Sequence, residues 1–284
     1  MIEPARRPRE FAFRRIVVAA DSSAHGQAAL EAAVRLAARL EADLEGLFVE
    51  DVNLKRLAEL PVGREVRFGL GGMARDAAAV AQDMRAEAGR IRRTLEEAAA
   101  RAHVRVSFRI AEGHVEREVV AAGSAADLLV LGLTGRRIGP TMQPGGTALA
   151  AIRESRRSVL VLRPGIDITR RALVLYDGSA GAGTALDAAA HVAADQAEAL
   201  TVVLRAADET EAAKLRRRAA QRLAKHNQGA RFLAVSEPTL SGLCRAVTRA
   251  GASMLVISAA DPLLEGNGHR RLLEDTACPV LLVR

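Results

Sequence analysis

The chain of 284 residues contains one pattern twice, and this duplication constrains its fold more than any other feature. The segment IVVAADSS near the start matches ALVLYDGS in the second half, so that Asp21 corresponds to Asp177 at an offset of 156 residues. The same offset pairs Leu30 with Leu186. One offset held over about thirty residues indicates an internal repeat, so the chain is expected to fold as two similar units.

Later pairs show where the second copy is shorter. The segment 127–132 (DLLVLG) pairs with 253–258 (SMLVIS) at an offset of 126, and 158–163 (SVLVLR) pairs with 279–284 (PVLLVR) at an offset of 121. Because the offset falls from 156 to 126, the second copy lacks 30 residues before its fourth strand. We attribute most of that difference to a helical insert in the first copy, at about 51–101.

The start of the first copy predicts its class of fold. Residues 16–20 form an apolar, β-branched run, and residues 44–49 form a second strand-like run. Between them, Ser22 and Ser23 offer helix N-caps, and residues 27–42 have helical periodicity with strong helix formers. Strand, helix and strand in this order make a βαβ unit, which favours a parallel sheet.

Both halves continue in the same alternation, so each is expected to contribute five strands. The predicted fold class is α/β, with two tandem open parallel five-stranded sheets flanked by helices in a Rossmann-like arrangement. The expected domains are a flexible N-terminal arm (1–13), an N-terminal domain (14–165) that includes the insert, and a C-terminal domain (170–284). In such sheets, ligands bind beyond the carboxyl ends of the strands at a switch in strand order.

A glycine-rich loop between an apolar strand and a helix is the best candidate for a ligand site. The strand ends at Gly132 and is followed by Gly135. The loop closes on Gly145, Gly146 and Thr147, where the helix begins. Strand, glycine loop and helix start can present backbone N–H groups to a phosphate, and glycine lets the backbone approach a ligand closely.

Two other residues are expected at the same edge of the sheet. Asp21, at the end of the first strand, can accept hydrogen bonds from a base or a ribose, and backbone near Val49 can contact an adenine edge. A plainer interpretation is that Gly132 and Gly135 are turn residues and that Thr147 is an ordinary N-cap. The residues alone leave both interpretations open.

With these features the chain resembles the universal stress proteins, here as a tandem pair. The resemblance rests on IVVAADSS and LVLYDGS at the two first strands, LFVED at the second strand, and the ending CPVLLVR. Members that bind ATP carry G-x-x-G, a spacer, and then Gly-Ser/Thr. Gly132 and Gly135 match the start, and nine residues separate Gly135 from Gly145. Gly146 then stands where Ser or Thr is expected, so Gly146 and Thr147 close the pattern one residue later.

Carried over to this chain, the resemblance implies ATP in the N-terminal domain, with Mg²⁺ as a candidate companion ion. Asp21 would contact the adenosine, and Val49 would line the adenine site. Gly132 and Gly135 would lie against ribose and phosphate. The loop closure at 145–147 would hold the phosphates.

The second copy departs from this pattern. Asp177 keeps the first-strand signature, but Ser258 and Asp261 stand where Gly132 and Gly135 are expected. An acidic residue in a phosphate loop repels the ligand, so we predict no ATP binding in the C-terminal domain and a structural or domain-pairing role instead. Since this half keeps its strands without the glycines, the contrast favours a ligand role for the glycines of the first half.

Bulk composition narrows the class of protein. The net charge is +7, but the basic residues are interleaved with Glu and Asp along helices, which argues against a nucleic-acid binder. No apolar run approaches the roughly 18–20 residues that cross a bilayer, and the start lacks a signal-peptide pattern, so we expect a cytoplasmic protein. Cys244 and Cys278 do not form a disulfide framework.

The leading interpretation is a stress-response regulatory protein that binds ATP without dedicated catalysis, and at most hydrolyses it slowly. The alternative is an interaction or dimerisation module that binds no nucleotide and acts through its surface and insert. Two copies in one chain also resemble a covalently linked form of the dimer common in this family. The final strands, 158–162 and 279–283, are the expected pairing edge, and a homodimer of whole chains is a further expectation.

Overall fold

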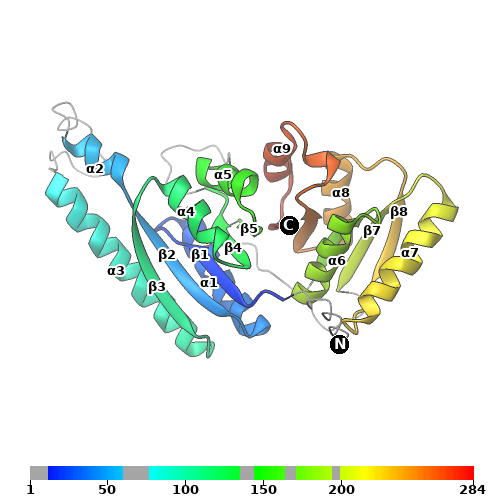
Figure 1. The fold of residues 1–284 in the computed structure, drawn as a ribbon, viewed down its shortest axis with the longest axis horizontal. Helices are drawn as coiled ribbons and strands as arrows, with labels where there is room; N and C mark the ends of the chain where they lie inside the picture. The colour runs from blue at the N-terminus through cyan, green and yellow to red at the C-terminus, as the bar shows by residue number, and fades with distance from the viewer. Residues whose placement is uncertain (1–11, 60–76, 135–143, 164–170, 194–198) are drawn as a thin grey trace, which may run out of the picture.

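The computed structural model is a single ten-stranded sheet with helices on both faces, built from two similar halves (Figure 1). It describes residues 12–59, 77–134, 144–163, 171–193 and 199–284.

The strands of the N-terminal half are β1 (Arg15–Ala19), β2 (Asp43–Asp51), β3 (Val106–Gly113), β4 (Leu128–Gly132) and β5 (Ser158–Leu162). Those of the C-terminal half are β6 (Ala172–Tyr176), β7 (Leu200–Arg205), β8 (Arg231–Val235), β9 (Met254–Ser258) and β10 (Val280–Val283). Their order across the sheet is β3-β2-β1-β4-β5-β10-β9-β6-β7-β8. All neighbours are parallel except β5 and β10, which pair antiparallel. The predicted fold class is therefore confirmed, with its two parallel sheets joined edge to edge.

Two layers of helices cover the sheet. One face carries α1 (Ala24–Leu40), α3 (Ala77–Arg101), α6 (Ala180–Val192) and α7 (Glu209–Ala224). The other carries α4 (Val115–Ser124), α5 (Gly146–Glu154), α8 (Leu240–Ala250) and α9 (Gly268–Asp275). The short α2 (Val52–Glu59) and the 3₁₀ turn η2 (Pro262–Leu264) lie in connections. Each layer buries its own apolar cluster, and both clusters include residues of the two halves.

The strand order places a switch point in each half. After β1 the chain adds β2 and then β3 on one side, whereas β4 and β5 lie on the other side of β1. The second half repeats this arrangement, with its switch between β6 and β9. Loops that leave neighbouring strands in opposite directions open a crevice at the carboxyl edge, which is where ligands bind in such sheets.

The two halves meet through their last strands, the pairing edge that the resemblance implied. Leu160 of β5 lies opposite Leu281 of β10, which is its own counterpart at the offset of 121 residues. The flanking pairs, Val161 with Val280 and Val159 with Leu282, are related to one another by the same offset. The junction is therefore a pseudo-twofold interface within one chain, of the kind that identical subunits form in a dimer.

Two arginines strengthen this junction in a reciprocal way. Arg284, which follows β10, donates from Nη2 to the carbonyl oxygen of Ile152 at 2.6 Å, near the end of α5. Arg163, which follows β5, donates to the carbonyl oxygen of Leu273, near the end of α9. Each guanidinium thus satisfies a free carbonyl and opposes the negative end of a helix in the other half.

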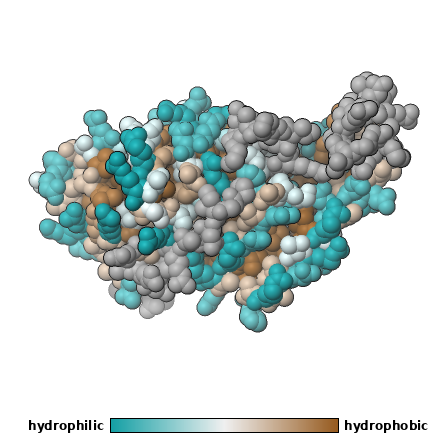
Figure 2. Space-filling model, turned by 180° about the vertical axis from the view of Figure 1, so that it is seen from behind, coloured by the Kyte–Doolittle hydropathy of each residue, from teal (hydrophilic) through white to brown (hydrophobic). Residues whose placement is uncertain are grey.

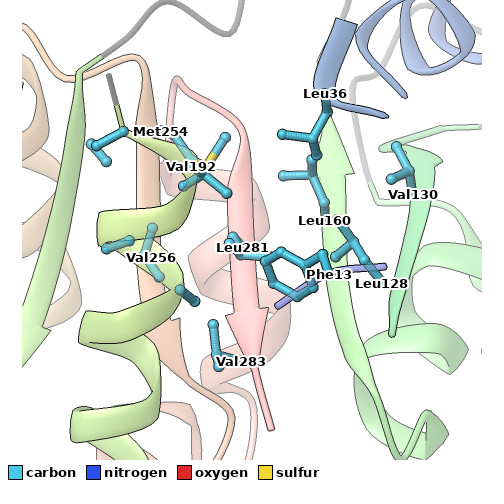
Figure 3. Packing of buried hydrophobic residues seen from close by; sticks show 14 of the residues in the cluster. Phe13, Leu36, Leu128, Val130, Leu160, Val192, Met254, Val256, Leu281 and Val283 are labelled. Carbon is cyan, nitrogen blue, oxygen red and sulfur yellow. The ribbon is translucent and has the colours of Figure 1, made fainter. Parts of the chain in front are cut away.

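Phe13 also belongs to the junction. It stands at the end of the predicted N-terminal arm, of which residues 1–11 lie outside the described part, and its side chain is only 2% exposed. Figure 3 shows its ring between Leu281 of β10 and the side chains of Leu128 and Leu160, and all four residues belong to one buried cluster. Phe13 therefore ties the start of the N-terminal half to the last strand of the C-terminal half.

The long helix α3 is a regular crossover helix with a counterpart in α7. Both connect the second and third strands of their halves, and both end on a left-handed residue, His103 (φ 56°) or Asn227 (φ 52°). The N–H of the next residue then returns to a carbonyl five residues earlier, Val104 to Ala99 and Gln228 to Leu223. Helix α3 has 25 residues and α7 has 16. Of the described residues between the second and third strands of the first half, α2 and the start of α3 therefore have no equivalent in the second half. The predicted domain boundaries themselves stay a prediction.

Among the described residues, no helix is both long and apolar enough to cross a membrane. The face seen in Figure 2 mixes hydrophilic and hydrophobic residues. Two large apolar side chains are exposed in the described part, Ile110 at 50% and Val235 at 37%, and they lie on the two edge strands, β3 and β8.

We predict that Phe13→Ala lowers the free energy of unfolding by about 3–5 kcal/mol, because it leaves a cavity between the halves. Urea denaturation followed by circular dichroism measures this loss. Ile110→Ala is the matched control, and it should change stability by less than about 1 kcal/mol because its side chain is half exposed. Equal losses in the two variants would contradict a junction role for Phe13.

Candidate functional site

The candidate site lies at the carboxyl edge of the N-terminal half, at its switch point. Asp21 follows β1, Val49 lies near the end of β2, and Gly132 ends β4, so three predicted residues come from neighbouring strands. The loop closure returns to the same edge, because the N–H of Gly145 donates to the carbonyl oxygen of Leu133 at 2.9 Å. Gly146 and Thr147 then begin α5. Gly135 lies outside the described residues.

Asp21 has a structural task in this arrangement. Its Oδ1 accepts hydrogen bonds from the N–H of Ser23, at 3.0 Å, and from the Ser23 hydroxyl. Ser23 in turn caps α1 by accepting from the N–H of Gly26 at 2.9 Å. Asp177 and Ser179 form the same turn in the second half. The Asp-x-Ser signature therefore positions a helix in both halves, whatever else Asp21 binds.

Gly132 is required by close packing against His25. A Cβ atom on Gly132 would lie 2.8 Å from the Cβ of His25 and 2.9 Å from its carbonyl oxygen. In the second half the glycine is on the helix instead of the strand, since Ser258 replaces Gly132 and Gly181 replaces His25. There, a Cβ atom on Gly181 would lie 2.5 Å from the Ser258 hydroxyl. Each helix can approach its strand because one member of the pair lacks a side chain, so Gly132 has a packing reason as well as its predicted ligand role.

His25 lies in an environment that favours its neutral form. Burial lowers the pKa of His25 below 6.5, and the charge of Arg163 lowers it further, whereas Asp21 opposes the shift. Its Nδ1 atom is buried without a hydrogen-bond partner in the described part of the chain. His269 repeats this pattern on α9, where burial and then the charges of Arg284 and Arg153 lower its pKa.

The start of α5 presents backbone N–H groups without a side-chain cap. Its N-cap residue is Gly145, which offers no side-chain acceptor, and the first turn contains no acidic residue. A helix start of this kind favours an anion, because the first N–H groups lack partners and the helix dipole is positive there. Glu116, in the first turn of α4, lies against this start, since a Cβ atom on Gly146 would collide with its Oε1.

The crossover helix α3 also reaches the site. Its Glu87, which is 7% exposed, accepts a hydrogen bond from the N–H of Ser22 at 3.3 Å. A helix from the middle of the predicted insert thus fixes the loop that follows β1.

The corresponding edge of the C-terminal half is closed by ion pairs. Arg205, which stands at the position of Val49, lies 2.7 Å from Asp261 and 3.7 Å from Asp177. Burial raises the pKa of Asp177, but hydrogen bonds from Ser179 and the charge of Arg205 outweigh it, so the pKa falls below its usual value. Asp261 is 7% exposed and also caps η2. Three site positions of the second half are therefore occupied by side chains that satisfy one another.

No group of three or more potential metal ligands occurs among the described residues. His114, which lies after β3, is the N-cap residue of α4, and its Nδ1 is 3.3 Å from the Nδ2 of Asn53.

The motifs in the sequence did not point to His25, Glu116 or Arg205 at these edges. Two of them left a signal in the repeat, because aligning the halves sets Gly181 against His25 and Arg205 against Val49. These two differences change the size and the charge of side chains at the edge of the second half, where Arg205 forms ion pairs. Glu116 left no such signal, since its place depends on how α4 packs against α5.

We predict that Gly132→Ser is destabilising by about 1–3 kcal/mol in wild-type background, because the added side chain meets His25. The same change should cost less in a His25→Gly background, because the contact with the Cβ of His25 at 2.8 Å is removed and only the contacts with the backbone of residue 25 remain. A double-mutant cycle by urea denaturation should give a coupling energy of at least about 1 kcal/mol. A coupling energy near zero would exclude the packing constraint.

A second prediction concerns pH. Because the pKa values of His25 and His269 are lowered in the folded state, the unfolded chain binds more protons near and below pH 6.5. Their contribution to stability is complete above the unfolded pKa and is lost as the pH falls through the folded pKa values. The free energy of unfolding should decrease from pH 7 to 5, and His25→Gln should make that decrease smaller. An equal decrease in wild type and His25→Gln would contradict this contribution of His25.

The comparisons with known proteins agree with this architecture. The family model described as the Universal stress protein family matches residues 12–163, which is more than half of the chain. A universal stress protein structure from Archaeoglobus fulgidus DSM 4304 is similar over 96% of this chain and 97% of its own, with a TM-score of 0.71 and 15% identity.

Two Pseudomonas aeruginosa structures are similar over 96% of the chain, each with a TM-score of 0.59. One is a functionally unknown protein from strain PAO1, with 15% identity and 92% of its own chain covered. The other is a putative universal stress protein from strain UCBPP-PA14, with 16% identity and 93% covered. A search of curated proteins found no match. On the family match and the fold, the chain belongs to the universal stress protein family.

Proposed function

We propose that the N-terminal half binds ATP, with Mg²⁺ accompanying its phosphates, and that the protein is a stress-response regulator without dedicated catalysis. Asp21 contacts the adenosine and Val49 lines the adenine site. Gly132 and Gly135 lie against ribose and phosphate. The loop closure at 145–147 holds the phosphates.

The observation that carries this proposal is the contrast between the two halves. In the second half, the counterparts of Asp21, Val49 and Gly135 are Asp177, Arg205 and Asp261, whose side chains form one ion-pair group. Positions far apart in the sequence thus converge at one edge of a shared scaffold. In the first half the same positions carry a carboxylate, a small apolar residue and a glycine, a combination suited to an external ligand.

The start of α5 supports the phosphate end of the proposal. Its N-cap, Gly145, leaves the first backbone N–H groups of the helix without a side-chain acceptor. Thr147 is only partly buried in the first turn, so its hydroxyl can add a hydrogen bond to a phosphate oxygen. The positive end of the helix dipole acts in the same direction.

The test has two parts. One portion of purified protein is denatured, and the nucleotide that it releases is identified by chromatography. ATP binding to native, nucleotide-free protein is measured by calorimetry. Thr147→Val should weaken ATP binding at least about tenfold, since a hydrogen bond to a charged group contributes about 1.5–3 kcal/mol. Thr248→Val on α8 is the matched control and should leave affinity unchanged, because its hydroxyl donates to the carbonyl oxygen of Cys244.

A further variant separates the halves. Asp261→Gly removes the partner of Arg205, and it should not alter the number of ATP molecules bound per chain if only the first half binds. Absence of nucleotide in all preparations, together with no binding at millimolar ATP, would contradict the proposal. It would favour the alternative of an interaction module without nucleotide.

A further inference from the structure

The carboxylate of Glu116 lies beside the helix start that is proposed to hold the phosphates. Glu116 lies in the first turn of α4, which packs against α5. A side chain at position 146 would collide with its Oε1, and even its Cδ would lie 3.4 Å from the added Cβ. The residue is otherwise exposed to solvent, so apolar packing does not hold it there.

A helix start without an acceptor attracts a carboxylate as well as a phosphate. The start of α5 has no acidic residue in its first turn and no side-chain acceptor at its N-cap. Unpaired N–H groups and the helix dipole therefore favour any anion within reach. Glu116 is a carboxylate of this chain that already lies within reach of that helix start.

Two comparisons within the chain connect Glu116 with the site. Gly146 is the position at which the sequence departs from the Gly-Ser/Thr ending, and it is also the position at which a side chain would meet Glu116. In the second half, α8 begins after Thr239 as α4 begins after His114, which sets Ser241 at the place of Glu116. The carboxylate therefore belongs to the half that keeps the glycine loop.

We propose that Glu116 is a specificity-determining residue that competes with the ligand's phosphates for the start of α5. It weakens polyphosphate binding relative to binding of the uncharged nucleoside, so that each added phosphate strengthens binding less than it would at an unoccupied helix start. This inference rests on the proposed function, since it assigns a charge preference to the same site.

The test compares adenosine, AMP, ADP and ATP by calorimetry, with the intact wild-type chain and with Glu116→Gln. Removing one negative charge beside the phosphates should tighten ATP binding at least about fivefold, which is the effect of one charge pair at 4 Å in water. Adenosine binding should change less than twofold. Glu154→Gln is the matched control, because it removes the same charge from the other, exposed end of α5 and should leave all four affinities unchanged.

The outcomes separate the inference from the proposed function. Suppose that wild type binds ATP and that the ratio of ATP affinity to adenosine affinity is the same in Glu116→Gln as in wild type. The proposed role of Glu116 is then excluded, while ATP binding stands. Weaker ATP binding in Glu116→Gln would also contradict it, because Glu116 would then assist the phosphates. If neither protein binds any of the four ligands, the proposed function fails and the inference fails with it.

Discussion

The antiparallel pairing of β5 with β10 is the interaction on which the rest of the structure depends. It converts two open parallel sheets into one sheet of ten strands, so that neither last strand is left as an exposed edge. Arg163 and Arg284 reinforce it by satisfying carbonyl oxygens at the end of a helix in the opposite half. Because counterparts face each other across the junction, the two carboxyl edges are related by pseudo-twofold symmetry, and one chain presents two versions of the same site.

The two versions have diverged in opposite directions. In the second half, Arg205 joins Asp177 and Asp261, and charges that a ligand would otherwise balance are balanced within the chain. In the first half, the described residues Asp21, Val49 and Gly132 form no such ion-pair group, and the exposed carboxylate of Glu116 lies beside the start of α5. The strands of the two halves stay equivalent, whereas the side chains at the site positions differ and the loop after the fourth strand is shorter in the second half.

Much of the fold could be predicted from the sequence, because the repeat fixed which segments are equivalent and hydrophobic periodicity separated strands from helices. The pairing of the last strands was expected from the resemblance to a dimer of the family. The burial of Phe13 could not be predicted, because its partners on β4, β5 and β10 are distant in sequence. The predicted residues Asp21, Val49 and Gly132 lie at one edge of the sheet, and their role in binding stays a prediction. The loss of Gly132 in the second half first indicated a ligand role, whereas the exchange of His25 for Gly181 supplies a packing reason that only a pairwise comparison of contacts reveals.

The central claim is that one edge of this chain accepts a nucleotide and that its counterpart is closed. The most direct measurement is a crystal structure of the full chain grown with ATP and Mg²⁺, in which electron density is compared at the β1/β4 and β6/β9 edges. We expect one nucleotide per chain, beside Asp21 and Gly132, and an unbroken Arg205–Asp261 pair at the other edge. Density at the β6/β9 edge, or a nucleotide bound away from both switch points, would contradict it.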